Sequence, residues 1–232
     1  MLHECLTRLV ETSSGKNPLE IIVNIDNDDE ETLQHKSYLE QEFKDLKILV
    51  SERFVNCHTK INELAFQAAG DIILPWGDDC MMLTDGWDEA AKWHFSAKTL
   101  TCKDNIWMGG IDSTSVDKVL HTHVGWYPDI FFITKQGRDA NGWLVHPHFI
   151  SLGADVATYC VYKGVDRYID LRIIKMDHVT HNTIEKVINP DNTAAEYRAR
   201  QYQRQSVDPF NYDYSKDIAL LQEDIDLCKA KL

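Results

Sequence analysis

Short apolar runs alternate with patterns of helical spacing along most of the chain. Runs with the length of a buried strand lie at 19–25, 46–50, 72–76, 106–108, 130–133 and 168–175. Apolar residues at helical spacing indicate helices at the start of the chain and at 61–68, 87–94 and 155–162, and a polar helix ends near residue 43. Strands that alternate with helices are typical of an α/β fold, in which a mostly parallel central sheet carries helices on its faces.

The pattern changes toward the C-terminus. We expect an exposed loop at 135–142, where polar residues and glycines are frequent. Beyond residue 181 a polar connection rich in Asn and Arg leads to a last helix with apolar residues at helical spacing. The sequence therefore predicts one α/β domain at 1–181 and a C-terminal helical extension at 182–232.

Composition narrows the classes of function. The formal net charge of -13 over 232 residues argues against broad binding to nucleic-acid phosphates, although it leaves a nucleic-acid acceptor possible in principle. The one candidate basic patch, Arg198, Arg200 and Arg204, is interpreted as a solvated helix face. No apolar stretch approaches the length of a membrane span. Six cysteines without paired spacing, and no leader sequence before them, predict a cytoplasmic protein.

A pair of carboxylates follows one of the predicted strands. A helix that stops at Gly70 leads into the apolar run 72–76 and then into Asp78 and Asp79. Ligands of parallel sheets bind beyond the carboxyl ends of the strands, so the pair stands where a ligand is expected. Carboxylates in this position could hold a divalent cation that neutralises the charge of a departing diphosphate. The structural alternative is a solvated Asp-Asp turn.

The same region carries a resemblance to a known family. Residues 62–79 (NELAFQAAGDIILPWGDD), followed by DGWD at 85–88, resemble the core of the family 2 glycosyltransferases. The resemblance spans residues 1 to about 181. It implies a GT-A fold and a metal-dependent, inverting transfer of a sugar from a nucleotide-diphosphate donor, expected to be a UDP-sugar. Mn²⁺ or Mg²⁺ would be the cofactor, and a hydroxyl-bearing acceptor the partner.

The resemblance also assigns roles to individual residues. Asp79 matches the carboxylate that binds the metal, and Asp78 its neighbour that reaches the ribose or the metal shell. Asp26 resembles the acid that recognises the nucleotide base, and Lys60 could approach the diphosphate. Asp155 resembles the general base that deprotonates the acceptor hydroxyl. Aspartate also favours helix N-caps, and the two roles are compatible.

A histidine is expected to complete the metal site. His178 and His181 follow the last predicted strand, where GT-A enzymes often place a histidine ligand, and we prefer His178. The sequence departs from the family at Gly77, because many relatives carry the first acid of an Asp-x-Asp motif there. The metal would then depend on one carboxylate.

The beginning of the chain is a second departure from the family. Family members start with a strand that cradles the nucleotide base, whereas here the chain starts in the helix that would follow it. Either the central strand is missing, or another segment fills its position, or the chain is a non-catalytic relative. Loss of that strand would expose two strand edges and an apolar seam. We expect weaker donor binding than in a version extended by about a dozen residues.

Two alternatives to a glycosyltransferase remain open from the residues. The pairs His121/His123 and His146/His148 have strand spacing, so each could hold a transition metal in a histidine-rich metallohydrolase. The second alternative is a GT-A-like binding module without catalytic activity, whose acidic loops would bind a partner. The identity of the acceptor cannot be read from loop sequences.

Overall fold

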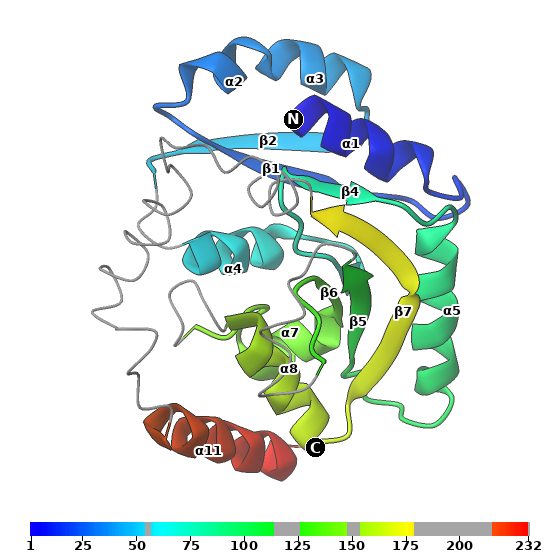
Figure 1. The fold of residues 1–232 in the computed structure, drawn as a ribbon, viewed down its shortest axis with the longest axis vertical. Coiled ribbons are helices and arrows are strands. Elements are labelled where there is room, and N and C mark those ends of the chain that lie inside the picture. The colour runs from blue at the N-terminus through cyan, green and yellow to red at the C-terminus, as the bar shows by residue number, and fades with distance from the viewer. Residues whose placement is uncertain (54–56, 114–125, 148–153, 179–214, 232) are drawn as a thin grey trace, which may run out of the picture.

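The chain folds into a mixed α/β structure (Figure 1). The computed structural model describes residues 1–53, 57–113, 126–147, 154–178 and 215–231.

Seven strands form two sheets in the described part of the chain. In the smaller sheet, β1 (Ile21–Asp26) pairs in parallel with β2 (Leu46–Ser51). The larger sheet has the order β3-β6-β5-β7-β4. Its strands are β3 (Ile72–Ile73), β4 (Cys80–Met82), β5 (Met108–Ser113), β6 (Phe131–Thr134) and β7 (Tyr168–His178).

The larger sheet is mixed rather than mostly parallel. Only β5 and β7 pair in parallel, and the other three pairings are antiparallel. Two short strands cause most of this difference from the expectation: β6 runs against both of its neighbours, and β4 lies against the far end of β7. The expected α/β class is confirmed at this coarser level.

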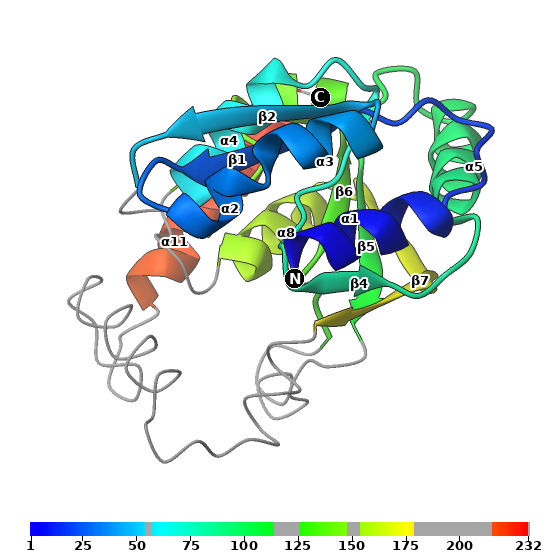
Figure 2. The same cartoon turned by 90° about the horizontal axis from the view of Figure 1, so that it is seen from above.

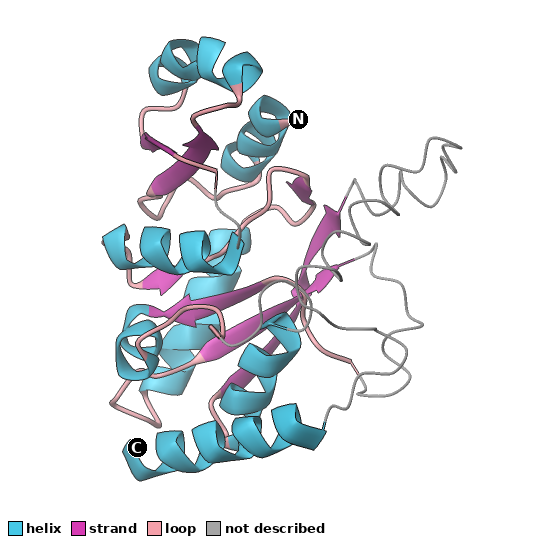
Figure 3. Ribbon diagram, turned by 90° about the vertical axis from the view of Figure 1, so that its left-hand side faces the viewer, coloured by secondary structure: helices cyan, strands magenta, loops and turns pink. Residues whose placement is uncertain are grey.

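Helices cover both sheets. Those before β5 are α1 (Leu2–Glu11), α2 (Glu30–Gln34), α3 (Lys36–Glu42), α4 (Cys57–Gln67) and α5 (Trp87–Thr99). Those after it are α7 (Lys135–Asn141), α8 (Ala154–Gly164) and α11 (Ser215–Lys231). Figures 1 and 3 show α5 on one side of the larger sheet and α7 and α8 on the other. Figure 2 shows α1 beside β4.

Most predicted elements are present with shifted ends. The helices predicted at the N-terminus and at 61–68, 87–94 and 155–162 are confirmed, as are the strands at 19–25, 46–50, 130–133 and 168–175. The predicted strand at 72–76 is confined to Ile72–Ile73, and the one at 106–108 begins only at Met108. The three-residue strand β4 was not predicted.

The prediction of an exposed loop at 135–142 was wrong, because this segment forms α7. Thr134 caps the helix, since its Oγ1 accepts a hydrogen bond from the backbone N–H of Gly137 at 3.2 Å. Gly142 ends it with a positive φ of 80°, as a C-terminal glycine commonly does. Arg138 is buried beneath α4. The polar composition of this segment is typical of a loop, so it indicated neither the short capped helix nor the burial of Arg138.

The described part of the C-terminal extension is a helix, as expected, and it packs on the α/β domain. Ile225 of α11 lies against Gly164 at the end of α8. His146 Nε2 and Asp224 Oδ2 are 2.7 Å apart, which ties α11 to the segment before α8. Residues 182–214 lie outside the described residues.

The buried carboxylate of Asp88 connects two parts of the core. It accepts hydrogen bonds from the Ser14 backbone N–H at 2.7 Å, the Ser14 hydroxyl at 2.6 Å and the Asn17 amide at 2.8 Å. Desolvation alone would raise the pKa of Asp88, but these hydrogen bonds outweigh it and the pKa is lowered. Asp88 therefore holds the link between α1 and β1 against the start of α5.

We expect Asp88→Ala to destabilise the fold by about 2–3 kcal/mol, because three donors lose a charged acceptor. Since the folded-state pKa is depressed, this contribution is present above the unfolded pKa near ~4 and disappears as the pH falls through the folded value. Urea unfolding at several pH values measures it. Asp85→Ala, at an exposed acid three residues earlier, is the control. Equal destabilisation by both variants would contradict the assignment.

Candidate metal site and adjoining cleft

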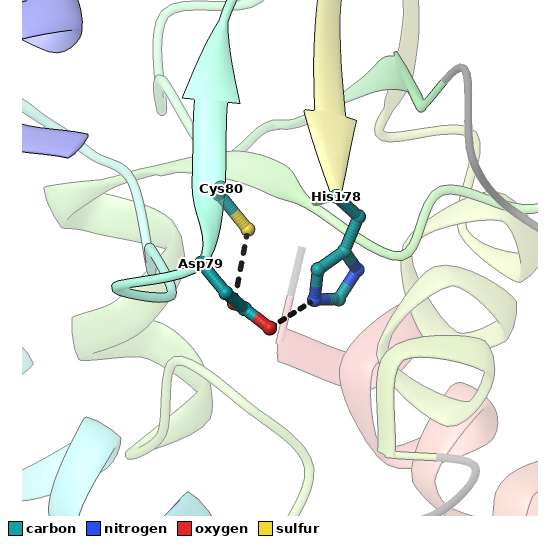
Figure 4. A group of neighbouring side chains, drawn as sticks. All are labelled: Asp79, Cys80 and His178. Carbon is teal, nitrogen blue, oxygen red and sulfur yellow. Dashed lines mark hydrogen bonds and ion pairs between the residues drawn. The ribbon is translucent and has the colours of Figure 1, made fainter. Parts of the chain in front are cut away.

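The two residues predicted to hold a metal meet in the structure. β4 and β7 pair antiparallel, with Cys80 opposite His178, and Asp79 directly precedes β4. His178 Nε2 lies 3.1 Å from Asp79 Oδ2, although the residues are 99 positions apart in sequence (Figure 4). The register of a single strand pair therefore brings a carboxylate and an imidazole together.

Cys80 completes a compact group with Asp79 and His178. Its Sγ lies 3.7 Å from Asp79 Oδ1, and one ligand atom from each of the three residues lies within 4.8 Å of the others (Figure 4). Cys80 is fully buried. Burial, and secondarily the Asp79 carboxylate, raise the pKa of the Cys80 thiol far above its ordinary value. In the metal-free protein, Cys80 is therefore a neutral thiol.

Asp129, which the sequence analysis missed, adds a second carboxylate. Its Oδ2 lies 3.8 Å from His178 Nδ1, so the imidazole stands between two acids. This Oδ2 is buried and has no hydrogen-bond partner among the described residues. In the described part of the chain, the nearest positive charge to this buried oxygen is therefore that of the protonated His178 ring, which offsets the cost of burying the carboxylate. In the sequence, Asp129 could have been recognised as a candidate because it directly precedes the predicted strand at 130–133.

Gly110 of β5 allows the segment of Asp129 to approach the sheet. A Cβ atom at Gly110 would lie 2.7 Å from Cγ of Pro128 and 2.5 Å from the hydroxyl of Tyr168. Such distances are too short for any side chain without a shift of its neighbours. The absence of a side chain at this position thus sets where Pro128 and Asp129 lie.

The charge on His178 follows from its neighbours. Burial would lower the pKa of His178, but the carboxylates of Asp129 and Asp79 outweigh burial and raise it to about 9. His178 is therefore an imidazolium at neutral pH in the metal-free protein. A metal ion would have to displace this proton, so metal binding should strengthen as the pH rises.

Asp155 lies in the first turn of α8 and in the same electrostatic neighbourhood. Its Oδ1 accepts a hydrogen bond from the Val156 backbone N–H at 2.8 Å. Desolvation, together with the Asp129 charge, raises the pKa of Asp155 to about 7. Desolvation and the charges of Asp155 and Asp129 also raise the pKa of Tyr127 to about 12. The charge of Asp129 therefore acts on the pKa of the predicted base.

The other three predicted residues lie on a separate cleft of about 1630 Å³. Asp26, Lys60 and Asp78 all line it. Lys60 Nζ is 3.0 Å from Glu63 Oε2, and Asp26 Oδ2 is 3.7 Å from the Arg53 guanidinium.

Asp78 joins the cleft to the metal site. It lines the cleft and directly precedes Asp79 in the chain. Desolvation and the Asp79 charge raise the pKa of Asp78. The predicted site thus has two parts, the metal-site group and the cleft, and Asp78 lies next to both.

Several candidates of the sequence analysis lie outside the described residues: His121, His123, His148, His181, Arg198, Arg200 and Arg204. His146 is described and is buried, with its Nε2 against Asp224 of α11. Its ring thus takes part in packing the C-terminal helix.

The donors at the metal-site group fit a divalent cation. A carboxylate oxygen from Asp79 and the Nε2 nitrogen of His178 suit an ion such as Mn²⁺, and Asp129 faces the other ring nitrogen, where it would orient the imidazole. The Cys80 sulfur would add a softer ligand only after losing its proton.

Comparisons with known proteins do not assign the chain to a group. No protein-family model matches it, and no curated protein matches it significantly. Among the described helices, none combines the length and the apolar character that a bilayer crossing requires.

Proposed function

We propose that the chain transfers a sugar from a UDP-sugar to a hydroxyl-bearing acceptor, as a metal-dependent, inverting glycosyltransferase of the GT-A type. The observation that carries the proposal is the contact between Asp79 and His178. The resemblance to family 2 glycosyltransferases assigned both residues to the metal on separate grounds. Their approach to 3.1 Å is the relation such a role requires.

Each part of the region has a role in this proposal. Asp79 and His178 would hold the cation, Asp129 would orient the imidazole from its other nitrogen, and the cation would neutralise the charge of the leaving diphosphate. Asp26, Asp78 and Lys60 would contact the nucleotide along the mouth of the cleft. The parallel β1–β2 pair and the mixed larger sheet are compatible with the arrangement of a GT-A domain.

Asp155 is suited to act as general base. Its pKa of about 7 lies near physiological pH, where a base both stays deprotonated in part and accepts a proton effectively. We therefore expect turnover to fall about tenfold per pH unit below pH 7, because only the carboxylate form of Asp155 can accept the proton of the acceptor hydroxyl.

The pH profile of initial rates at saturating donor and saturating Mn²⁺ tests this expectation, because saturation with metal removes the pH dependence of metal binding at His178. In Asp155→Asn the residual turnover should lose its dependence on pH near 7. An unchanged profile in that variant would assign the titration to another group.

A zinc-dependent hydrolase is the second candidate, and Cys80 is the observation that favours it. Zn²⁺ takes cysteine, histidine and carboxylate ligands in tetrahedral sites. The chain would then retain stoichiometric zinc through purification. A binding module without catalysis would instead bind UDP and metal but leave the sugar donor intact.

Metal content and donor hydrolysis separate these functions. Purified protein is analysed for bound metals, stripped with a chelator, and titrated calorimetrically with Mn²⁺, Mg²⁺ and Zn²⁺, each with and without UDP. The glycosyltransferase proposal expects Mn²⁺ and UDP to strengthen each other's binding, and slow hydrolysis of a UDP-sugar that depends on Mn²⁺. Tight zinc with no response to UDP would reject it.

A further inference from the structure

Gly77 is the position beside the metal-site group where a side chain is excluded. A Cβ atom at this residue would lie 2.6 Å from Oδ1 of Asp79 and 3.2 Å from Sγ of Cys80. The first distance is shorter than the contacts that Cβ atoms make in proteins, so any side chain at position 77 would displace the Asp79 carboxylate. The glycine thus leaves the space in which Asp79 and Cys80 approach each other.

The backbone conformation does not require this glycine. The described glycines with a positive φ are Gly15, Gly86 and Gly142, and Gly77 is not one of them. An alanine could therefore adopt the same backbone conformation without strain. Position 77 excludes only the volume of a side chain, and that volume borders two candidate metal ligands.

The turn from Gly77 to Cys80 is held from two sides. The Gly77 carbonyl accepts a hydrogen bond from the Cys80 backbone N–H at 3.2 Å, and the thiol of Cys5 in α1 donates to the same carbonyl at 3.4 Å. Beyond the turn, Cys80 pairs with His178 across β4 and β7. We therefore expect a side chain at position 77 to be accommodated by rotation of the Asp79 side chain, because these bonds hold the backbone of the turn.

Asp79 turns one carboxylate oxygen toward each of the other two ligands. Its Oδ1 lies 3.7 Å from the Cys80 sulfur, and its Oδ2 lies 3.1 Å from His178 Nε2 (Figure 4). Around one tetrahedral zinc ion, a sulfur and an oxygen ligand are about 3.5 Å apart, and a nitrogen and an oxygen ligand about 3.3 Å. Both measured separations are therefore close to those around a bound ion.

An ion can reach this group from the side of Asp79 and His178. Their side chains are 21% and 19% exposed, whereas Cys80 is fully buried. Thiolate sulfur favours ions such as Zn²⁺, whereas Mn²⁺ favours oxygen ligands. The Cys80 thiol gives its proton to water as the bond between sulfur and metal forms. Cys80 therefore discriminates between the two kinds of ion when Asp79 lies beside it.

We propose that Gly77 is a positioning residue that sets which ion the site prefers. Without a side chain at position 77, the three ligands can close on one thiophilic ion such as Zn²⁺. With a side chain there, Asp79 turns away from Cys80 and the preference moves toward Mn²⁺. The inference rests on the cation site of the proposed function but not on the transfer of a sugar, and it requires no reaction at the bound ion.

Metal binding to Gly77→Ala tests the proposal in the full chain without a substrate. Co²⁺ substitutes for Zn²⁺ and shows a charge-transfer absorption when it is bonded to a thiolate. The wild-type protein, stripped of metal, should show this absorption with Co²⁺, and Gly77→Ala should lose most of it. The ratio of the affinities for Zn²⁺ and Mn²⁺, measured by competition calorimetry, should fall about 10–100-fold, as is usual when a residue that holds a metal ligand in place is changed.

Gly70→Ala is the matched control. Gly70 also lacks a positive φ, and the nearest atom to a Cβ there would be the Ile72 carbonyl oxygen at 3.7 Å, an ordinary contact. This variant should keep the absorption and the affinity ratio of the wild type. Both alanine variants should unfold cooperatively near the wild-type temperature, which separates a loss of binding from a loss of folding.

A double variant shows whether Gly77 acts through the thiolate. Cys80→Ser should remove the absorption and lower the affinity ratio, and the addition of Gly77→Ala should lower the ratio no further. No absorption in the wild type, an undiminished absorption in Gly77→Ala, an equal loss in Gly70→Ala, or additive losses in the double variant would each overturn the proposal. Absence of Mn²⁺-dependent donor hydrolysis would instead reject the proposed transferase and leave these binding results unchanged.

Discussion

Asp79→Asn is expected to reduce metal-stimulated turnover of a UDP-sugar by about 10³-fold. The amide keeps the shape of the side chain but removes the charge that faces His178 at 3.1 Å. Stabilisation of a leaving diphosphate by a cation is worth several kcal/mol, and about 4 kcal/mol corresponds to this factor. Steady-state hydrolysis of the donor with and without Mn²⁺ measures the loss.

The controls for Asp79→Asn separate metal binding from folding. Glu31→Gln removes an exposed acid of α2 and should leave turnover unchanged. The Asp79 variant should unfold near the wild-type temperature yet show much weaker binding of Mn²⁺ in calorimetry. Metal-stimulated turnover within tenfold of wild type would remove Asp79 from the site.

Arg138→Met is expected to produce the largest loss of stability, about 3 kcal/mol, or roughly 6–12 °C in Tm. The guanidinium is buried, and its Nη1 donates to the backbone carbonyls of Ala65 and Ala68 at the end of α4. Methionine would fill much of the volume, but the Ala68 carbonyl would lose the Arg138 donor and the Ala65 carbonyl would keep only the backbone N–H of Ala68.

Urea unfolding of Arg138→Met should be compared with that of Arg172→Met. Arg172 pairs with Asp170 on the surface, where loss of an ion pair costs less than about 1 kcal/mol. A similar small effect for both variants would show that the buried arginine is dispensable.

The candidate site was predictable where it follows from the ends of strands. Asp79 follows an apolar run, and His178 follows the last predicted strand, where the resemblance to GT-A enzymes implies a histidine ligand. Their contact depends on the antiparallel pairing of β4 with β7, and β4 is too short to produce a recognisable pattern. Both residues could therefore be identified from the sequence, but the strand pairing that brings them into contact could not be predicted.

Asp129 and Arg138 show where sequence patterns fail. Asp129 lies in a stretch with no motif, and only the fold brings it to His178. Arg138 stands among polar residues typical of a loop, and its burial depends on contacts with α4, about 70 residues earlier in the chain. The helix or loop propensity of a short segment carries no information about contacts with residues so distant in the sequence.

The expectation of a mostly parallel sheet does not hold for the larger sheet, because β4 and β6 run antiparallel to their neighbours. These strands have three and four residues, which is too short for a sequence pattern to indicate their direction.

Gly110 connects the packing of the larger sheet with the pKa of His178. Pro128 rests on this glycine, and the next residue supplies one of the two carboxylates that keep His178 protonated. A methyl group at position 110 would force Pro128 or the Tyr168 hydroxyl to shift, and a shift of Pro128 would carry Asp129 with it and change the pKa of His178. The pH at which His178 releases its proton to a metal ion would then depend on a glycine inside the sheet that is not itself a ligand.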